Sequence, residues 1–552
     1  MKKRILASLL CAAMALGTFS GCSSDGGASS SEASSSSGTS SSSEAASSEG
    51  SSEGEEAGTG SGVVFPDTMT SLTVELFDRA NIPESQGTLE DNQWTRWVKE
   101  EMQKLNVDVT FIPVPRGEET TKLNVLLASG TAPDISFTYD RVLFAQYASD
   151  GGLTPLDDYM DTYGKTIVEL FGSEILDYGV LDGVQYAVPA RRASTSHYMS
   201  FIRKDWLDEI GMEVPTNKAE LKEALAAFKE RDPNCIPWGI FPEKSGQRFS
   251  CHDFYLYDAM YSFFERDDEQ DWTTPEPMRT GFKDFMQWLN ELYAEGLIDQ
   301  EFSTKTTAEL KYADGVNDKV GFYIEGEWTP YGTDSKAVYR HLLEVNPDAE
   351  YVPVECFENA DGHYYKTHYP PIGLYIFVPT TCESPEAAVT YMNWQADGDV
   401  AWRISYGDEG VQYEMEGDVP KIIDAEEWQN TLGYISSDLK LMYNGDPIMP
   451  QEQEMAILRD KAGDLGDFAV ETRELALKDA LTEKLFNREI KSETTYGAEL
   501  TTTCDSYWST LITSTNFDAD YEAFVAELES KGINEIIAER TRSQIVQVIG
   551  KK

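Results

Sequence analysis

The alternation of strand-like and helix-like segments near the start of the chain is the feature that most constrains its fold. Short apolar and β-branched runs occur at residues 71–77, 107–113 and 134–138, and amphipathic stretches at residues 92–105 and 118–129 separate them. Strands joined through helices at this spacing pair in parallel, and the pattern predicts a doubly wound α/β sheet. Ligands of such sheets bind beyond the carboxyl ends of the strands.

Four polar residues follow those strand ends. Arg79 and Asn81 come after the first run, and Tyr139 and Asp140 come after the third. We therefore predict that these side chains face a ligand. The alternation continues along the chain, with helices predicted near 216–229, 277–295, 385–397 and 452–486 and strands at 320–324 and 373–378. This pattern indicates a single α/β protein of two lobes.

Residues 1–21 are predicted to be an export signal. The basic Lys2-Lys3-Arg4 precedes an apolar run at residues 5–19, and Ser20-Gly21-Cys22 follows it. Basic, apolar and small-residue parts in this order are typical of a secretory signal. The apolar run is too short to span a bilayer comfortably, since about 20 residues are needed.

The segment Phe19-Ser20-Gly21-Cys22 resembles the lipobox of bacterial lipoproteins, although Phe19 replaces the usual leucine-like residue. The resemblance implies that Cys22 carries a lipid and anchors the protein on the extracytoplasmic face of the bacterial cell membrane. The alternative is a secreted protein that is cut elsewhere. Residues 22–62 consist largely of Ser, Gly, Ala, Glu and Thr, and this composition predicts a disordered tether.

The charge of the chain limits its partners. It has 45 basic and 96 acidic residues, which give a formal charge of −51. Nucleic-acid binding is excluded, because phosphate contact needs a basic surface. We interpret the acidity as a solubilising surface and predict neither a metal nor a cofactor. The widely spaced Cys235, Cys251, Cys356, Cys382 and Cys504 indicate buried free thiols with room for one disulfide.

The segment Leu127-Ala-Ser-Gly-Thr-Ala-Pro-Asp-Ile135 resembles a signature of the extracellular solute-binding proteins of ABC transporters. Further segments resemble this family in the expected order, at residues 183–189, 202–216, 221–232, 295–302, 319–323, 406–413 and 516–532. The set is similar to the lipoprotein-A-like branch, whose large members bind carbohydrates. The resemblance implies a two-lobed, type II periplasmic-binding-protein-like fold with a ligand cleft between the lobes. It also implies a monomer that captures an oligosaccharide or sugar and delivers it to permease subunits.

The two lobes are predicted from these matches. We assign residues 63–190 and 368–430 to lobe 1 and residues 191–367 and 431–552 to lobe 2, with crossings near 187–195 and 351–372. Alginate-type members of the family often carry a calcium loop after the segment that matches residues 228–234. Here Cys235-Ile236-Pro237 follows directly, so the oxygen ligands are missing and we predict no calcium at residues 230–240.

A carbohydrate cleft combines aromatic platforms with a few polar groups that orient the ligand. Glu327, Trp328 and Tyr331 follow a predicted strand, at a place where the family tends to put a ligand-stacking aromatic residue. Trp402 and Tyr406 lie one helical turn apart, and Arg191 and Arg192 stand at the first crossing, where a guanidinium can bind a sugar carboxylate. These seven residues are the further predicted ligand contacts. The alternative for the aromatic residues is packing within a lobe, and the alternative for the arginines is a contact that ties the lobes together.

Two other functions remain open from the sequence. A lipid-anchored glycoside hydrolase or lyase would need a positioned pair of carboxylates, and a ligand-presenting sensor subunit would share the whole fold. No H-E-x-x-H motif is present, and the one Gly-x-Ser-x-Gly match, residues 50–54, lies in the predicted tether rather than after a predicted strand. We therefore predict a binding protein without catalytic residues.

Overall fold

The computed structural model describes residues 64–240, 256, 260–264, 270–305, 308–333, 336–481, 485–543 and 545–546. The predicted signal at residues 1–21, the lipid site Cys22, the tether at 22–62 and Cys251 lie outside the described residues. Gly62–Lys552 forms one compact unit. Within the described part of the chain, no helix has both the length and the apolar character that a membrane crossing requires.

The first sheet confirms the three strands predicted near the N-terminus. β1 (Thr70–Asp78) pairs in parallel with β2 (Val107–Pro115), and a parallel bridge between Val74 and Ile135 brings β3 (Ser136–Thr138) beside β1. The neighbours of β3 continue in the order β12 (Ile372–Phe377), β6 (Ala187–Arg192) and β15 (Tyr443–Asn444). β12 runs antiparallel to β3 and β6. The sheet is therefore mixed: the three predicted strands are parallel, as expected, and β12 adds an antiparallel strand beyond β3.

Helices cover this sheet, and their ends follow local sequence signals. The Asn92 side chain accepts bonds from the amides of Trp94 and Thr95, and the Thr95 hydroxyl accepts one from the amide of Asn92, so a capping box starts the first helix. The helices of this part are α1 (Gln93–Gln103), α2 (Glu119–Ser129), α3 (Arg141–Ser149), α4 (Asp157–Tyr163), α5 (Lys165–Leu176), α13 (Pro385–Gln395), α14 (Gly398–Tyr406) and α16 (Tyr434–Leu439). Their apolar faces join the sheet in one buried cluster.

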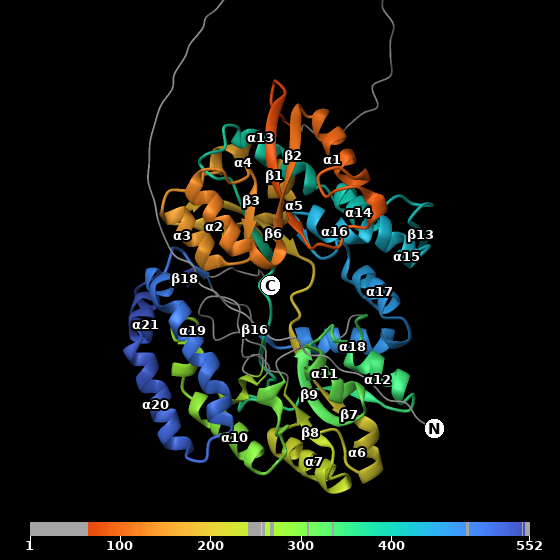
Figure 1. Cartoon of the computed structure of the whole chain (residues 1–552), viewed down its shortest axis with the longest axis vertical. Helices are drawn as coiled ribbons and strands as arrows, with labels where there is room; N and C mark the ends of the chain where they lie inside the picture. The colour runs from red at the N-terminus through yellow and green to blue at the C-terminus, as the bar shows by residue number, and fades with distance from the viewer. Residues whose placement is uncertain are drawn as a thin grey trace, which may run out of the picture. The chain divides into compact units, whose positions relative to one another are not determined.

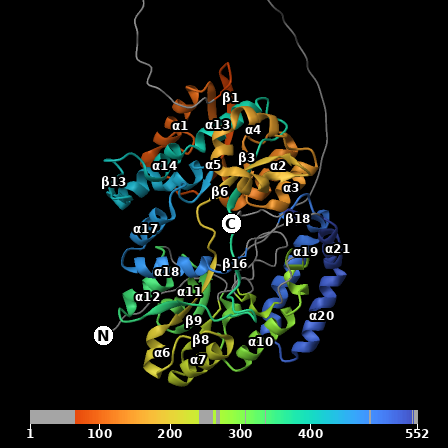
Figure 2. The same ribbon diagram turned by 180° about the vertical axis from the view of Figure 1, so that it is seen from behind.

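A second four-stranded sheet has its own core. Its order is β10 (Tyr351–Val354), β7 (Tyr198–Arg203), β9 (Val320–Gly326) and β8 (Ile236–Gly239). Around it lie α6 (Lys204–Ile210), α7 (Lys218–Arg231), α10 (Phe282–Ala294), α11 (Ala308–Val316), α12 (Val338–Val345), α18 (Gly466–Leu477), α19 (Lys491–Ile512), α20 (Phe517–Ser530) and α21 (Ile533–Arg542). Separate buried clusters fill this part. The two cores confirm the two-lobed α/β fold, seen from opposite sides in Figure 1 and Figure 2.

Smaller elements complete the described chain. They are the pairs β4 (Val180–Leu181) with β5 (Val184–Gln185), β11 (Lys366–Thr367) with β16 (Ala480–Leu481), β13 (Tyr413–Glu416) with β14 (Val419–Ile422) and β17 (Leu485–Phe486) with β18 (Ile545–Val546), and the helices α9 (Gln270–Thr273), α15 (Ala425–Trp428) and α17 (Gln451–Ala462). Among the described residues, Cys235, Cys356, Cys382 and Cys504 form no disulfide with one another, and all except the partly buried Cys235 are buried.

The chain crosses between the lobes at several points. It leaves the first sheet after β6, passes through residues 193–197 and enters the second sheet at β7; the segment after β10 leads back to β12. A further crossing, residues 445–450, leads from β15 to α17. These short segments are drawn between the lobes in Figure 1.

Two predictions about the C-terminal third need correction. Residues 431–444 were expected in lobe 2, but their apolar side chains pack in the first core because β15 pairs with β6. The helix predicted near 452–486 is two helices, α17 and α18. The chain turns between them at Gly463, whose φ of 61° is a left-handed value that glycine adopts without strain.

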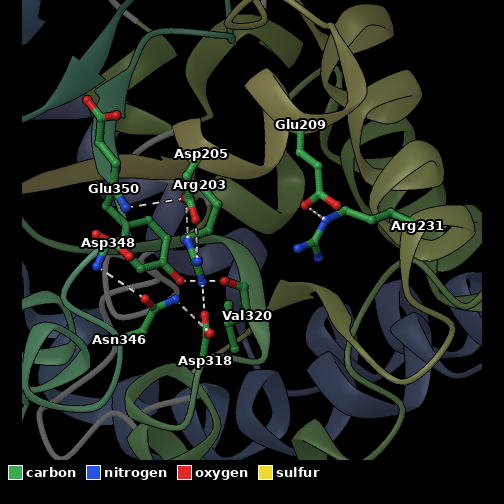
Figure 3. A network of polar contacts seen from close by, with 10 residues as sticks. Arg203, Asp205, Glu209, Arg231, Asp318, Val320, Asn346, Asp348 and Glu350 are labelled. Carbon is green, nitrogen blue, oxygen red and sulfur yellow. Dashed lines mark hydrogen bonds and ion pairs between the residues drawn. The ribbon is translucent and has the colours of Figure 1, made fainter.

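A buried arginine ties together the second lobe. Arg203 is 1% exposed, and its guanidinium contacts Asp205 at 2.6 Å and also pairs with Asp318 (Figure 3). It lies over the ring of Trp206, 4.5 Å from the ring centroid. Arg231 lies over the same ring at 4.6 Å, but its side chain is 24% exposed and its partner Glu209 is 60% exposed. The two arginines therefore make the same kinds of contact at different depths.

We expect Arg203→Met to lower the free energy of unfolding by about 3 kcal/mol, because it leaves two carboxylates without their cation. The matched control Arg231→Met should cost less than about 1 kcal/mol, since its ion pair is largely hydrated. Urea denaturation of both variants measures the difference. Equal losses would show that stacking on Trp206, rather than the buried ion pairs, dominates.

Candidate ligand-binding site

Two adjoining cavities lie where the chain crosses between the lobes. The larger has a volume of about 550 Å³ and the smaller about 490 Å³, and both are lined by Arg192, Ala193, Ser194 and Glu454. The larger cavity is also lined by Ser196, Tyr369 and residues of 327–333, 444–446, α17 and α18. The smaller is also lined by Arg191, Thr195, Met449, Leu477 and residues of α5, α17 and the segment before β12. Each volume falls in the range of small-molecule sites.

Aromatic rings form one wall of the larger cavity. Trp328 is 41% exposed, and its ring centroid lies 6.2 Å from that of Tyr369 with the planes inclined by 31°. The guanidinium of Arg192 lies 4.3 Å from the centroid of Tyr369, and the ring of His197 lies 3.9 Å from it. The wall therefore presents the exposed indole of Trp328 beside a tyrosine ring that contacts a cation.

The local sequence fixes the position of Trp328. β9 ends at Gly326, and the Thr329 amide donates to the Gly326 carbonyl at 2.9 Å, which turns the chain back. The indole packs directly against this glycine, where a Cβ atom would lie 3.0 Å from the ring. A side chain at position 326 would therefore require the indole to shift by a few tenths of an ångström.

A buried carboxylate organises the same wall. Glu327 has 0% exposure and accepts hydrogen bonds from the Ser196 hydroxyl at 2.7 Å, from the Tyr331 hydroxyl and from Arg473. Burial disfavours the charge of Arg473, but Glu327 outweighs this effect and raises the pKa of the guanidinium. Burial, reinforced by Glu327, also raises the pKa of Tyr331 far above its usual range. Glu327 is thus an ion-paired acceptor that joins the first crossing, β9 and α18.

A second polar network lies at the third crossing. Asp446 accepts hydrogen bonds from the Tyr406 hydroxyl at 2.9 Å and from Lys461 at 3.1 Å. Burial opposes ionisation of Asp446, yet Lys461 and then Lys440 hold its pKa below the ordinary value. Because Tyr406 belongs to α14 and Lys461 to α17, this network links the first lobe to the helix that follows the crossing.

The predicted ligand residues separate into two groups. Trp328, Glu327, Tyr331 and Arg192 line the larger cavity, and Arg191 and Arg192 line the smaller. Tyr406 lies behind Asp446, and Trp402 packs 4.6 Å from Tyr406 and donates to the Tyr413 hydroxyl at 3.0 Å. Sequence reasoning missed Tyr369, Asp446, Glu454, Lys461 and Arg473, which also line the larger cavity.

The four strand-end residues engage other parts of the first lobe. Arg79 forms a bidentate pair with Asp438 at 2.7 and 2.8 Å, and Asn81 donates to the Tyr434 carbonyl at 3.3 Å. Asp140 caps α3 by accepting from two backbone amides. Tyr139 stacks on Phe77, with the Arg116 guanidinium 4.8 Å from its centroid. These side chains do not line the two described cavities, and their predicted contact with ligand stays a prediction.

Two carboxylic acids lie close together in the first lobe. Glu75, on β1, is 2% exposed, and its Oε2 accepts a hydrogen bond from the Phe137 amide at 3.2 Å. Burial raises the pKa of Glu75 to about 8, and the nearby Glu119 adds to the shift. Burial likewise raises the pKa of Glu119. The first lobe therefore folds around a glutamic acid that favours its neutral form.

The loop before β8 offers a compact turn. The Asp232 carboxylate accepts hydrogen bonds from the Asn234 amide at 2.9 Å and from its side chain at 3.2 Å, and β8 starts at Ile236. Among the residues that the structure describes, no group of three or more His, Cys, Asp or Glu side chains could hold a metal. The absence of calcium at residues 230–240 stays a prediction.

Known proteins resemble this chain in sequence and fold. The sequence model of the family described as "Bacterial extracellular solute-binding protein" matches residues 86–399. Polygalacturonan/rhamnogalacturonan-binding protein YtcQ of Bacillus subtilis (strain 168) is 24% identical over 479 residues, which cover 80% of this chain and 86% of YtcQ. Lipoprotein LipO of the same organism is 26% identical over 219 residues, 36% of this chain and 40% of LipO.

A solved structure shares the fold. The extracellular solute-binding protein from Bifidobacterium longum subsp. infantis has a TM-score of 0.64 and 18% sequence identity, and the match covers 87% of this chain and 99% of that protein. At this identity the likeness supports the two-lobed fold alone.

The raised pKa of Glu75 should make the free energy of unfolding depend on pH. Its pKa is about 8 in the folded protein against an ordinary value of 4.5, so between these values the folded state holds a proton that the unfolded state has released. The stability from this proton is complete below about pH 4.5 and is lost as the pH rises towards 8. Relative to Glu75→Gln, the wild type should lose up to about 1.4 kcal/mol per pH unit in this window.

Urea denaturation at pH 5, 6, 7 and 8 measures this difference. Glu100→Gln, which changes an exposed glutamate of α1, should leave the slope of the wild type unchanged. If the curves of the wild type and Glu75→Gln run parallel, Glu75 is ionised in the folded protein and the assignment is wrong.

Proposed function

The chain belongs to the bacterial extracellular solute-binding proteins, and we propose that it captures an oligosaccharide or sugar in the two crossing cavities and delivers it to the permease of an ABC transporter. The aromatic wall of Trp328 and Tyr369 beside Arg192 carries this proposal. A pyranose ring has an apolar face that packs on such a surface, and its hydroxyl groups need donors and acceptors around the rim. The name of YtcQ, a polygalacturonan/rhamnogalacturonan-binding relative, supports the same ligand class.

Capture and release require a change in the cavities. Ser194 and Ser196 of the first crossing, and Gly445 and Asp446 of the third, are themselves part of the larger cavity wall. Rotation of one lobe about these segments would change the cavity directly. A ligand that contacts both lobes favours the closed form only by its extra affinity for that form. A permease that recognises the closed form would then receive loaded protein in preference to empty protein.

We propose binding without catalysis. A glycosidase needs one carboxylic acid and one carboxylate held free for the glycosidic bond. In the larger cavity, Glu327 and Glu454 both pair with Arg473, and Asp446 pairs with Lys461. Such pairing orients polar groups but removes the free acid that a hydrolase requires. An oligosaccharide incubated with the protein should therefore be recovered uncut.

The proposed location follows from the N-terminal sequence. We propose that Cys22 carries a lipid and holds the two-lobed part on the extracytoplasmic face of the cell membrane through the Ser-rich residues 22–62. The extracellular family supports the compartment, and the name of the lipoprotein LipO supports the form of attachment.

Trp328→Ala should weaken saccharide binding about 10- to 100-fold, because the ligand loses the apolar surface of the indole. Trp328→Phe keeps an aromatic ring and should retain most of the affinity. Thermal unfolding of residues 63–552 against plant, host and microbial oligosaccharides first identifies a ligand, and titration calorimetry then compares the variants. Unchanged affinity of Trp328→Ala would remove Trp328 from the site.

Cys22→Ser should move the protein from the membrane fraction to the soluble or secreted fraction, because a thiol is needed for lipid attachment. Fractionation of the native bacterium and incorporation of labelled palmitate measure the two consequences. Cys11→Ser, in the predicted signal, provides the matched control and should leave both unchanged. A Cys22→Ser protein that stays in the membrane fraction would contradict the anchor.

A further inference from the structure

Two consecutive arginines stand at the end of β6. Arg191 and Arg192 both line the smaller cavity, and Arg192 also lines the larger. Among the residues that the structure describes, neither guanidinium forms an ion pair with a carboxylate. Cations without an ion pair are unusual in a chain whose 96 acidic residues outnumber its 45 basic residues.

The other cations of the cavity walls are paired. Lys461 contacts Asp446 at 3.1 Å, and Arg473 contacts Glu327 and Glu454. Two carboxylates, Glu174 and Glu454, also line the smaller cavity, but Glu454 is already held by Arg473 at 3.2 Å. Among the described residues that line the smaller cavity, both guanidinium groups and one carboxylate, Glu174, therefore form no ion pair.

Arg192 is also held in place before any ligand arrives. Its Nε donates to the Ile372 carbonyl at 3.1 Å, and its Cζ lies 4.3 Å from the centroid of Tyr369. These contacts use one edge and one face of the guanidinium, and no described residue accepts from its terminal nitrogens. A fixed guanidinium edge with free N–H groups matches the two oxygens of a carboxylate.

We infer that the smaller cavity binds a carboxylate and that the ligand is an acidic saccharide, with a uronic acid facing Arg191 and Arg192 and a neighbouring ring on the wall of Trp328 and Tyr369. This inference rests on the proposed function and narrows it to one class of sugar. Because the cavities share Arg192, Ala193 and Ser194, one oligosaccharide can occupy both. The partly buried cations gain a partner only when the ligand is bound, so a neutral sugar leaves them unpaired.

Matched pairs of ligands test this inference on residues 63–552. Oligosaccharides of galacturonic, glucuronic, mannuronic and guluronic acid are compared by titration calorimetry with the same oligosaccharides after methyl esterification or carboxyl reduction. The wild type should bind at least one acidic form at least 10-fold more tightly than its neutral counterpart. This preference should shrink as the salt concentration rises.

The variants Arg191→Gln and Arg192→Gln should each weaken binding of the acidic form about 10- to 100-fold and leave binding of the neutral form nearly unchanged. Arg192→Lys should recover only part of the loss, because an ammonium cannot form the two-pronged contact. Arg459→Gln, on the exposed side of α17 and paired with Asp467, should bind like the wild type. Thermal unfolding of every variant without ligand separates lost binding from lost folding.

The outcomes distinguish the inference from the function on which it rests. Equal or tighter binding of the neutral forms would overturn the inference and leave saccharide capture intact. If neither the acidic nor the neutral members of the panel bind, saccharide capture itself fails, and the inference fails with it. An acid preference that persists in both glutamine variants would show that the carboxylate binds elsewhere.

Discussion

The fully buried carboxylate of Glu327 is the interaction on which the cavity wall depends. A charge at this depth is costly unless cationic and hydroxyl donors surround it. Two of its donors come from distant segments, Ser196 in the first crossing and Arg473 in α18, and the third, Tyr331, follows in the same loop after β9. Their contacts bring these segments to one point. Trp328 is the next residue in the chain, so its ring has a fixed position on the wall.

The segments that cross between the lobes form the cavity wall together with residues of the lobes. Residues of the first and third crossings contribute directly to its wall, and Asp446 ties α14 to α17 through Tyr406 and Lys461. Polar networks that span a hinge give the resting protein a defined geometry, and their partners can rearrange when a ligand brings new contacts. The same segments therefore connect the two lobes and form part of the cavity wall.

The sequence predicted the elements and part of the site. β-branched runs and amphipathic stretches identified β1, β2, β3, α1 and α2, because these signals act over a few residues. Trp328 was predictable because it follows a buried strand. Arg473 was not, because its position on an amphipathic helix carries no sign that Glu327 lies beside it, 146 residues away in the sequence. Arg79 shows the same limit: its place at a strand end was predicted, but the sequence does not reveal that Asp438 pairs with its guanidinium.

The most direct test of the account is a crystal structure of residues 63–552 with a bound oligosaccharide found by the binding screen. The account predicts a sugar ring packed on Trp328 and Tyr369, hydrogen-bonded to residues of both lobes, with the lobes closer together than in the unliganded protein. A sugar bound instead at the ends of β1, β2 and β3, beside Tyr139 and Asp140, with the crossing cavities unchanged, would contradict it.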